Sequence, residues 1–158
     1  MAQVYLETSF FSACVGTRQD ARSVYWRETS NEWWSTQAVR HELFISPEVL
    51  AELSAPTFPR RDAALDMLRG LTMLEVTSEV LGFADILIRE KLMPTPVAGD
   101  AIHLAAATIH GMDYLLSWNV KHLANPNKRD HLAAVCLRLG LIPPLIVTPD
   151  LLENTENE

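Results

Sequence analysis

Short apolar runs alternate with longer amphipathic segments along the whole chain. Five runs rich in β-forming residues predict strands, at positions 3–6, 42–45, 73–76, 114–118 and 143–147. Helical start and stop signals predict helices at positions 8–16, 22–39, 47 to the prolines at 56 and 59, 60–70, 77–91, 97–111 and 130–139. Because strands alternate with helices throughout, we expect a three-layer α/β/α sandwich with a mostly parallel central sheet of about five strands.

Hydroxyl residues stand at the start of three of the predicted helices. They are Thr8 with Ser9, Ser46 before a proline, and Thr77. Side-chain oxygens at such positions accept hydrogen bonds from the first backbone N–H groups of a helix, so we expect these residues to be caps.

The predicted helix at 22–39 has no single apolar face, because Trp26, Trp33 and Trp34 do not all fall on one side of it. Two interpretations stay open: the helix is broken, or it presents an aromatic surface. The pair Trp33 and Trp34 is more typical of a core with one exposed ring. A docking or homodimer surface is the alternative.

Length and composition are typical of one globular domain. The chain has 158 residues, 48% of them hydrophobic and 21% charged, and we expect a domain at 1–150 with a polar tail at 151–158. No apolar run of about twenty residues predicts a membrane span, and no signal peptide is visible. Cys14 and Cys136 lie in apolar helical segments, which is typical of buried thiols in a reducing cytoplasm.

Charge and missing motifs exclude several kinds of function. The net charge of −7 argues against a broad basic surface that grips duplex DNA, but it is compatible with an acidic pocket that holds a divalent cation. The chain has no Gly-rich nucleotide loop and no Gly-x-Ser-x-Gly elbow. Neither cysteine lies in a CxxC pair, which argues against zinc.

Four acidic or amide residues stand at or near the ends of apolar runs. Glu7 and Asn119 follow two predicted strands, whereas Glu52 and Asp100 lie on predicted helices. In a parallel sheet, ligands collect beyond the carboxyl ends of the strands where the strand order reverses, so we expect these residues to share a crevice. Hard divalent cations need oxygen ligands from separate elements, and the set therefore predicts a metal site.

Each candidate also has an ordinary structural interpretation. Glu7 and Asp100 suit helix N-termini, where a carboxylate is favourable, and Asn119 is a common turn residue. His103 follows Asp100 by one helical turn and is more typical of a satisfied packing residue than of a ligand.

Three neighbouring positions have similar alternatives. Glu52 follows Glu48 by one turn, and we expect one of the two to face solvent. Thr8 and Ser117 either bind water around a cation or cap helices.

The four segments together resemble the PIN domain, specifically the VapC-like ribonuclease toxins of bacterial toxin–antitoxin pairs. The resemblance spans positions 4–149. It is most specific at 99–105, Gly-Asp-Ala-Ile-His-Leu-Ala, and at 113–123, Asp-Tyr-Leu-Leu-Ser-Trp-Asn-Val-Lys-His-Leu. The family motif has an Asp after the first strand, a later Glu, an Asp opening a helix and an Asp or Asn after the fourth strand. The matching positions are Glu7, Glu52, Asp100 and Asn119.

The resemblance implies an endoribonuclease that depends on Mg²⁺ or on Mn²⁺. Glu7, Asp100 and Glu52 would hold the cation, Glu52 would accept a proton from the attacking water, and Asn119 would orient a water. Further residues would support the cation or meet substrate phosphates: Thr8 and Ser117 in the first role, and Lys121, Arg40 and His122 in the second.

The resemblance also implies partners. They are an RNA substrate, a small antitoxin protein and a second copy of the chain in a homodimer, all in the cytoplasm. Glu7 replaces the usual Asp, and Asn119 replaces the Asp of many members. These departures keep an alternative open, in which the chain is a PIN-like module that has lost turnover and acts by binding RNA or protein.

Overall fold

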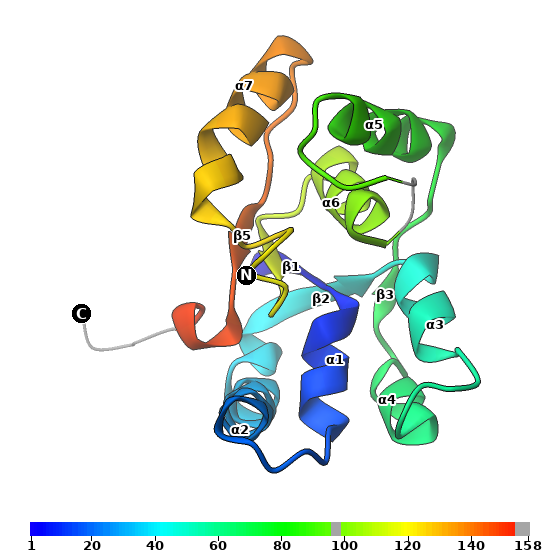
Figure 1. Ribbon diagram of the computed structural model, residues 1–158, viewed down its shortest axis with the longest axis vertical. Helices are drawn as coiled ribbons and strands as arrows, with labels where there is room; N and C mark the ends of the chain where they lie inside the picture. Colours follow the sequence, from blue (N-terminus) through cyan, green and yellow to red (C-terminus); the bar gives the residue numbers. More distant parts are fainter. Residues whose placement is uncertain (96–98, 154–158) are drawn as a thin grey trace.

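A parallel five-stranded sheet lies between helices at the centre of the protein (Figure 1). The structure is a computed structural model that describes residues 1–95 and 99–153. The strand order is β3-β2-β1-β4-β5, and all neighbouring strands run parallel. The strands are β1 (Ala2–Leu6), β2 (His41–Ile45), β3 (Thr72–Met73), β4 (Tyr114–Leu116) and β5 (Leu145–Val147).

Helices cover both faces of this sheet, which confirms the predicted three-layer α/β/α sandwich. Figure 1 shows α1, α2 and α4 on one face, α5, α6 and α7 on the other, and α3 near β3. The α-helices are α1 (Thr8–Val15), α2 (Ala21–Thr36), α3 (Pro47–Leu53), α4 (Arg61–Met67), α5 (Ser78–Arg89), α6 (Gly99–Ile109) and α7 (Arg129–Arg138). Short 3-10 turns are η1 (Ala38–Arg40), η2 (Pro126–Lys128) and η3 (Pro149–Leu151).

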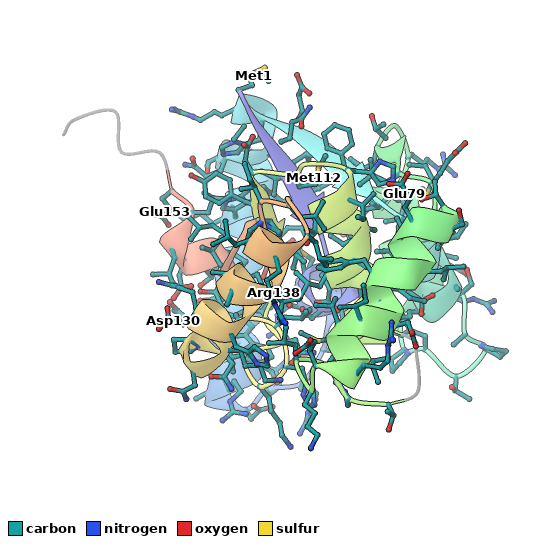
Figure 2. All side chains as sticks on the ribbon, turned by 90° about the horizontal axis from the view of Figure 1, so that it is seen from above. Met1, Glu79, Met112, Asp130, Arg138 and Glu153 are labelled. Atoms are coloured by element: carbon teal, nitrogen blue, oxygen red, sulfur yellow. The ribbon has the colours of Figure 1, made fainter. Side chains whose placement is uncertain are left out.

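The core is centred on β1 and α6. Val4, Tyr5 and Leu6 of β1 are fully buried, as expected for the middle strand of a sheet covered on both faces. The small side chains at 105–107 of α6 are also fully buried, which lets this helix approach the sheet closely. Seen from above in Figure 2, α5 and α7 lie side by side over one face, and Arg138 of α7 forms a 3.2 Å ion pair with Glu90 after α5.

Three of the predicted strands are shorter than their apolar runs, and the one expected at 114–118 ends at Leu116. The strand expected at 73–76 is Thr72–Met73, because these residues pair with Phe44 and Ile45 at the end of β2. The strand expected at 143–147 begins at Leu145, because the two preceding residues are prolines and have no N–H group for the sheet.

The expected helix at 22–39 is broken. The α-helix ends at Thr36 and the 3-10 turn η1 follows. Trp33 is 2% exposed and donates its indole N–H to the backbone oxygen of Leu152 at 2.7 Å. Trp34 is partly buried and lies against the ring of Phe10. The two tryptophans therefore do not form the exposed docking or dimer surface that was the alternative expectation.

Of the three predicted caps, Thr77 is confirmed, Ser46 is confirmed in its position but not in its hydrogen bond, and the one at Thr8 and Ser9 is wrong. Thr77 accepts the backbone N–H of Val80 at 3.3 Å. The first helix is capped by the carboxylate of Glu7. Ser46 makes no cap hydrogen bond, because its hydroxyl lies against the hydroxyl of Tyr5 inside the protein.

Other expectations concern the termini and the cysteines. The expected helix start at 97 and the tail residues 154–158 lie outside the described residues. Cys14 and Cys136 are free and buried as expected, and burial raises the pKa of the Cys14 thiol to about 12. Among residues 1–95 and 99–153, no helix is both long and apolar enough to cross a membrane.

Candidate active site

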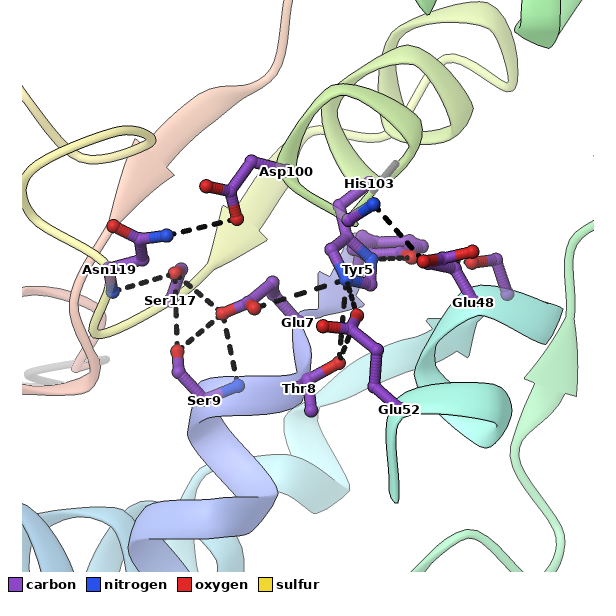
Figure 3. A network of polar contacts seen from close by, with 12 residues as sticks. Tyr5, Glu7, Thr8, Ser9, Glu48, Glu52, Asp100, His103, Ser117 and Asn119 are labelled. Atoms are coloured by element: carbon purple, nitrogen blue, oxygen red, sulfur yellow. Dashed lines mark hydrogen bonds and ion pairs between the residues drawn. The ribbon is translucent and has the colours of Figure 1, made fainter. Parts of the chain in front are cut away.

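The candidate site lies at the carboxyl ends of β1 and β4, where the strand order reverses. The chain runs from β1 to β2 and β3 on one side, and later to β4 and β5 on the other. Glu7 follows β1, and Ser117 and Asn119 follow β4. Asp100 stands in the first turn of α6, and Glu52 lies near the end of α3. The reversal brings these side chains to one edge of the sheet, as Figure 3 shows.

The carboxylate of Glu7 is 4% exposed and is held by two serines. Its Oε2 accepts the backbone N–H of Ser9 at 3.1 Å, the hydroxyl of Ser117 at 2.8 Å and the hydroxyl of Ser9. Ser9 Oγ in turn accepts the backbone N–H of Trp118 at 2.8 Å. A buried carboxylate is costly without such donors, so these contacts keep Glu7 in its position as the cap of α1.

Asp100 is tied to the same group of residues through Asn119. Asn119 Nδ2 donates to Asp100 Oδ1 at 3.0 Å, and Asn119 Oδ1 accepts the backbone N–H of His122 at 3.1 Å. The backbone N–H of Asn119 donates to Ser117 Oγ at 2.9 Å. Because Ser117 also donates to Glu7, an unbroken series of hydrogen bonds joins Asp100, Asn119, Ser117 and Glu7 (Figure 3).

Glu52 belongs to a second network, centred on the fully buried His103. His103 Nε2 hydrogen-bonds Glu52 Oε1, and Thr8 Oγ1 donates to the same oxygen at 2.9 Å. On the other side of the ring, His103 Nδ1 lies 2.6 Å from the hydroxyl of Tyr5. That hydroxyl lies 2.7 Å from Ser46 Oγ. The network connects β1, α1, α3 and α6.

Electrostatics favour an ion pair within this network. Burial alone would lower the pKa of His103, but the hydrogen bond to Glu52 and the negative charges of nearby carboxylates, including Glu7, outweigh burial and raise it. Burial alone would raise the pKa of Glu52, yet the hydrogen bond and charge of His103 and the hydrogen bond of Thr8 lower it. Protonated His103 then donates from both ring nitrogens, to Glu52 and to Tyr5.

Sequence reasoning did not assign the central residues of these networks to the site. Ser9 and Ser46 were expected to be helix caps, and His103 was expected to be a satisfied packing residue. His103 is indeed buried with both nitrogens paired, but one of its partners is Glu52. Its position three residues after Asp100 placed it on the same side of α6, which was the available signal.

The expectation that one of Glu48 and Glu52 faces solvent is wrong. Both side chains are half-buried. Glu48 Oε1 accepts the backbone N–H of Gly99 at 3.1 Å, which ties α3 to the start of α6.

Only some of the predicted phosphate contacts lie near the site. Lys121 and His122 follow Asn119 in the turn after β4, with Lys121 exposed and His122 half-buried. Arg40 directly precedes β2 and therefore lies at the amino edge of the sheet, where His41 pairs with Ala2. Five residues of strand, about 16 Å, separate this edge from the carboxyl ends. Arg40 therefore lies apart from the candidate site, and its contact with substrate phosphates stays a prediction.

The donor atoms of Glu7 and Asp100 fit a hard cation such as Mg²⁺. Hydrogen bonds from described residues fall on Oε2 of Glu7 and on Oδ1 of Asp100. Oε1 of Glu7 lies 3.9 Å from His103 Nε2, an ion-pair distance, and Oδ2 of Asp100 is the oxygen left without a hydrogen bond from the described residues. Mg²⁺ is commonly held by one or two carboxylates together with waters. The predicted set of three is absent, because the described parts of the chain hold no group of three Asp, Glu, His or Cys side chains arranged for a metal. Glu52 is turned to His103 instead.

Comparison with known proteins identifies the fold. No protein-family model and no curated protein sequence matches the chain. A structure of VapBC2 from Rickettsia felis, bound to a DNA fragment from their promoter, is similar with a TM-score of 0.59 and 15% identity, over 92% of this chain and 98% of that one. Mycobacterium tuberculosis VapC20, a sarcin-ricin loop cleaving toxin, is similar with a TM-score of 0.56 and 22% identity, over 75% and 92%. The strand order, the layers and these similarities together give the chain a VapC-like PIN fold.

Proposed function

We propose that this protein is a metal-dependent ribonuclease that hydrolyses RNA phosphodiester bonds. The observation that carries the proposal is the series of hydrogen bonds from Asp100 through Asn119 and Ser117 to Glu7, at the reversal point of the sheet. Ligand sites of open α/β sheets are found at such points. The similar fold of VapC20, which cleaves the sarcin-ricin loop, supports RNA as the substrate.

In the proposed reaction, Glu7 and Asp100 would hold Mg²⁺ or Mn²⁺ together with waters. The bound cation would polarise the phosphoryl oxygen and stabilise the charge that develops on it. Asn119 keeps Asp100 in place through its 3.0 Å hydrogen bond. Lys121 and His122, in the same turn, lie where they are able to meet phosphates of the substrate.

Glu52 accepts the proton of the attacking water in this proposal. The water oxygen bonds to phosphorus, its proton passes to the carboxylate, and the bond from phosphorus to the leaving ribose oxygen breaks. That oxygen takes a proton from solvent. His103 and Thr8 occupy Oε1 of Glu52, whereas Oε2 lies close to Gly99 at the start of α6. The lowered pKa of Glu52 keeps the carboxylate ionised and able to accept a proton.

Cleavage of a single-stranded RNA with Mg²⁺ or Mn²⁺ tests the proposal. The wild-type protein is expected to cleave it, and Asp100→Asn to lower the rate by about 100-fold or more, because it removes a charge that holds the cation. Asp130→Asn is the matched control, since Asp130 stands in the first turn of α7 as Asp100 does in α6. Equal rates for wild type and Asp100→Asn would overturn the assigned site.

We also propose a small antitoxin as the partner and the cytoplasm as the place of action. The similarity to VapBC2, which is bound to a DNA fragment from their promoter in its structure, supports the partner. The product of a neighbouring small reading frame is expected to co-purify with the chain and to inhibit cleavage. A homodimer is expected as well, and light scattering measures it, with a monomer mass as the contrary result.

One observation favours a second candidate, a PIN-like binding module without turnover. Glu7 Oε2 already accepts three hydrogen bonds and caps α1, so this carboxylate has a complete structural role without a metal. Titration with Mg²⁺ and Mn²⁺ by calorimetry separates the two candidates. Measurable binding that Asp100→Asn weakens supports the nuclease, whereas no binding supports the module.

A further inference from the structure

A cavity of about 420 Å³ lies beside the candidate site, between α7, β5 and the loop that follows β4. Its size falls within the range of ligand pockets, roughly 300–1,000 Å³. Val120, His122 and Arg129 line it together with Ala133, Leu145 and Leu151. Apart from His122, the residues that take part in the reaction proposed above do not line this space.

The loop after β4 connects the cavity directly to the candidate site. His122 lines the cavity, and its backbone N–H donates to Asn119 Oδ1 at 3.1 Å. Asn119 in turn donates to Asp100. A molecule in the cavity therefore touches the residue that adjoins the Asp100–Asn119 pair.

The charges at the cavity have one sign. The ionisable side chains among the described residues that line it are His122, Lys128 and Arg129, and no carboxylate is among them. The whole chain has the opposite balance, with 20 acidic and 13 basic residues. A basic cavity on an acidic protein attracts anions to this place, and phosphate groups of a nucleic acid are such anions.

The walls of the cavity are mostly aliphatic and partly open to solvent. Val120 is 52% exposed, Leu145 51% and Leu151 72%. Burial of such side chains against a flat apolar surface is favourable. The combination of aliphatic walls and basic side chains suits a ligand with one flat apolar part and one anionic part, which is the chemistry of a nucleotide.

We propose that this cavity binds an unpaired nucleotide of single-stranded RNA near the scissile phosphate. The base lies against Val120, Leu145 and Leu151, and Arg129 meets an adjacent phosphate. A base within a duplex is stacked and paired, so only an unpaired base is able to enter. The link to cleavage rests on the ribonuclease activity proposed above, whereas nucleotide binding in the cavity does not.

A pair of variants on α7 tests the proposal. Ala133 is exposed and lines the cavity, whereas Ala134, its neighbour on the same helix, is exposed but does not line it. Ala133→Trp places a large ring in the cavity, and Ala134→Trp adds the same ring outside it. Two assays are used. In the first, each of the four nucleoside 5′-monophosphates is added, and its binding is monitored by NMR of the methyl groups of Val120, Leu145 and Leu151. In the second, cleavage of a single-stranded RNA is measured.

We expect at least one monophosphate to shift these methyl signals in the wild type and in Ala134→Trp, with a tenfold or larger loss of affinity in Ala133→Trp. We also expect KM for RNA to rise about tenfold in Ala133→Trp alone, with little change in kcat. Equal KM values for the two variants would overturn the proposal, and so would NMR signal changes caused by the monophosphates only outside the cavity. Binding of an acidic protein segment in the cavity in place of a nucleotide would also overturn it. If neither the wild type nor either variant cleaves RNA, the ribonuclease proposal fails. The monophosphate titrations then decide by themselves whether the cavity binds a nucleotide.

Discussion

His103 of α6 hydrogen-bonds Glu52 of α3 through Nε2, and this buried histidine has its second nitrogen on Tyr5 of β1. The contact joins residues 51 positions apart in the sequence. Nε2 also lies 3.9 Å from Glu7 Oε1, so His103 stands between the two glutamates, and against the effect of burial its hydrogen bond and charge lower the pKa of Glu52.

Replacing His103 by Gln is expected to reduce RNA cleavage by about 10- to 100-fold, because residues that orient a functional carboxylate commonly have effects of this size. The free energy of unfolding is expected to fall by about 1–3 kcal/mol, the range for hydrogen bonds to charged groups. Affinity for Mg²⁺ is expected not to fall, since the variant removes a positive charge 3.9 Å from Glu7 Oε1 and His103 does not hold the cation. Kinetics, chemical denaturation and calorimetry measure the three quantities.

His110→Gln provides the matched control for this variant. His110 follows α6 and bonds to the backbone oxygen of Glu75 at 2.8 Å, away from the site. Cleavage by this control is expected to match the wild type. A loss of Mg²⁺ affinity in His103→Gln as large as the loss of cleavage would show that His103 supports cation binding and does not only position Glu52.

Replacing Ser9 by Ala is expected to loosen the Glu7 carboxylate. The hydroxyl of Ser9 donates to Glu7 Oε2 and accepts the backbone N–H of Trp118, so the variant leaves a buried donor and a buried carboxylate with fewer partners. We expect a loss of about 1–3 kcal/mol in the free energy of unfolding and weaker Mg²⁺ binding. Ser12→Ala, on the same helix, is the control and is expected to change neither, whereas equal stability of both variants would contradict the role of Ser9.

Replacing Asn119 by Asp is expected to have opposite effects with and without metal. The variant exchanges the hydrogen bond to Asp100 for repulsion between two carboxylates, so Tm in the presence of a chelator is expected to fall. Added Mg²⁺ or Mn²⁺ relieves this repulsion, and affinity is expected to rise by about tenfold, because ligand charge tunes the affinity of such sites. Asn127→Asp adds the same charge in η2 and controls for net charge. A metal affinity equal to that of the wild type would argue against a cation beside Asp100.

Replacing His41 by Phe is expected to change how stability depends on pH. The ring of His41 stacks on Trp33 with centroids 5.9 Å apart, and neither of its nitrogens has a hydrogen-bond partner among the described residues. Burial lowers the pKa of His41, and the positive charges of the N-terminus and Arg40 lower it further.

The sign of the effect follows from this lowered pKa. Below the unfolded pKa of about 6.5, the unfolded chain binds a proton that the folded chain does not, so His41 makes the protein less stable as the pH falls. Urea unfolding of the wild type and of His41→Phe at about pH 7.5 and pH 5.5 measures this change in the free energy of unfolding. The wild type is expected to lose more stability than His41→Phe between these values, and parallel losses would contradict the expectation.

The sequence by itself determined the succession of strands and helices along the chain and the positions of the acidic residues within them. Both follow from local physics: apolar runs, proline and capping residues act over a few neighbours, and a parallel sheet places the ends of its strands at one edge. Glu7 and Asn119 therefore reached the expected edge, and Asp100 reached the expected first turn of its helix.

The tertiary structure decided which side chains are partners. Ser46 looked like a cap and binds Tyr5, Glu52 looked like a ligand and binds His103, and Arg40 looked like a phosphate contact but stands at the opposite edge. These outcomes depend on distances between residues far apart in the chain, which are set by the strand order and by how α3 and α6 pack. A local pattern predicts that a residue is polar and near a strand end, but only the packed fold determines what lies within hydrogen-bonding distance.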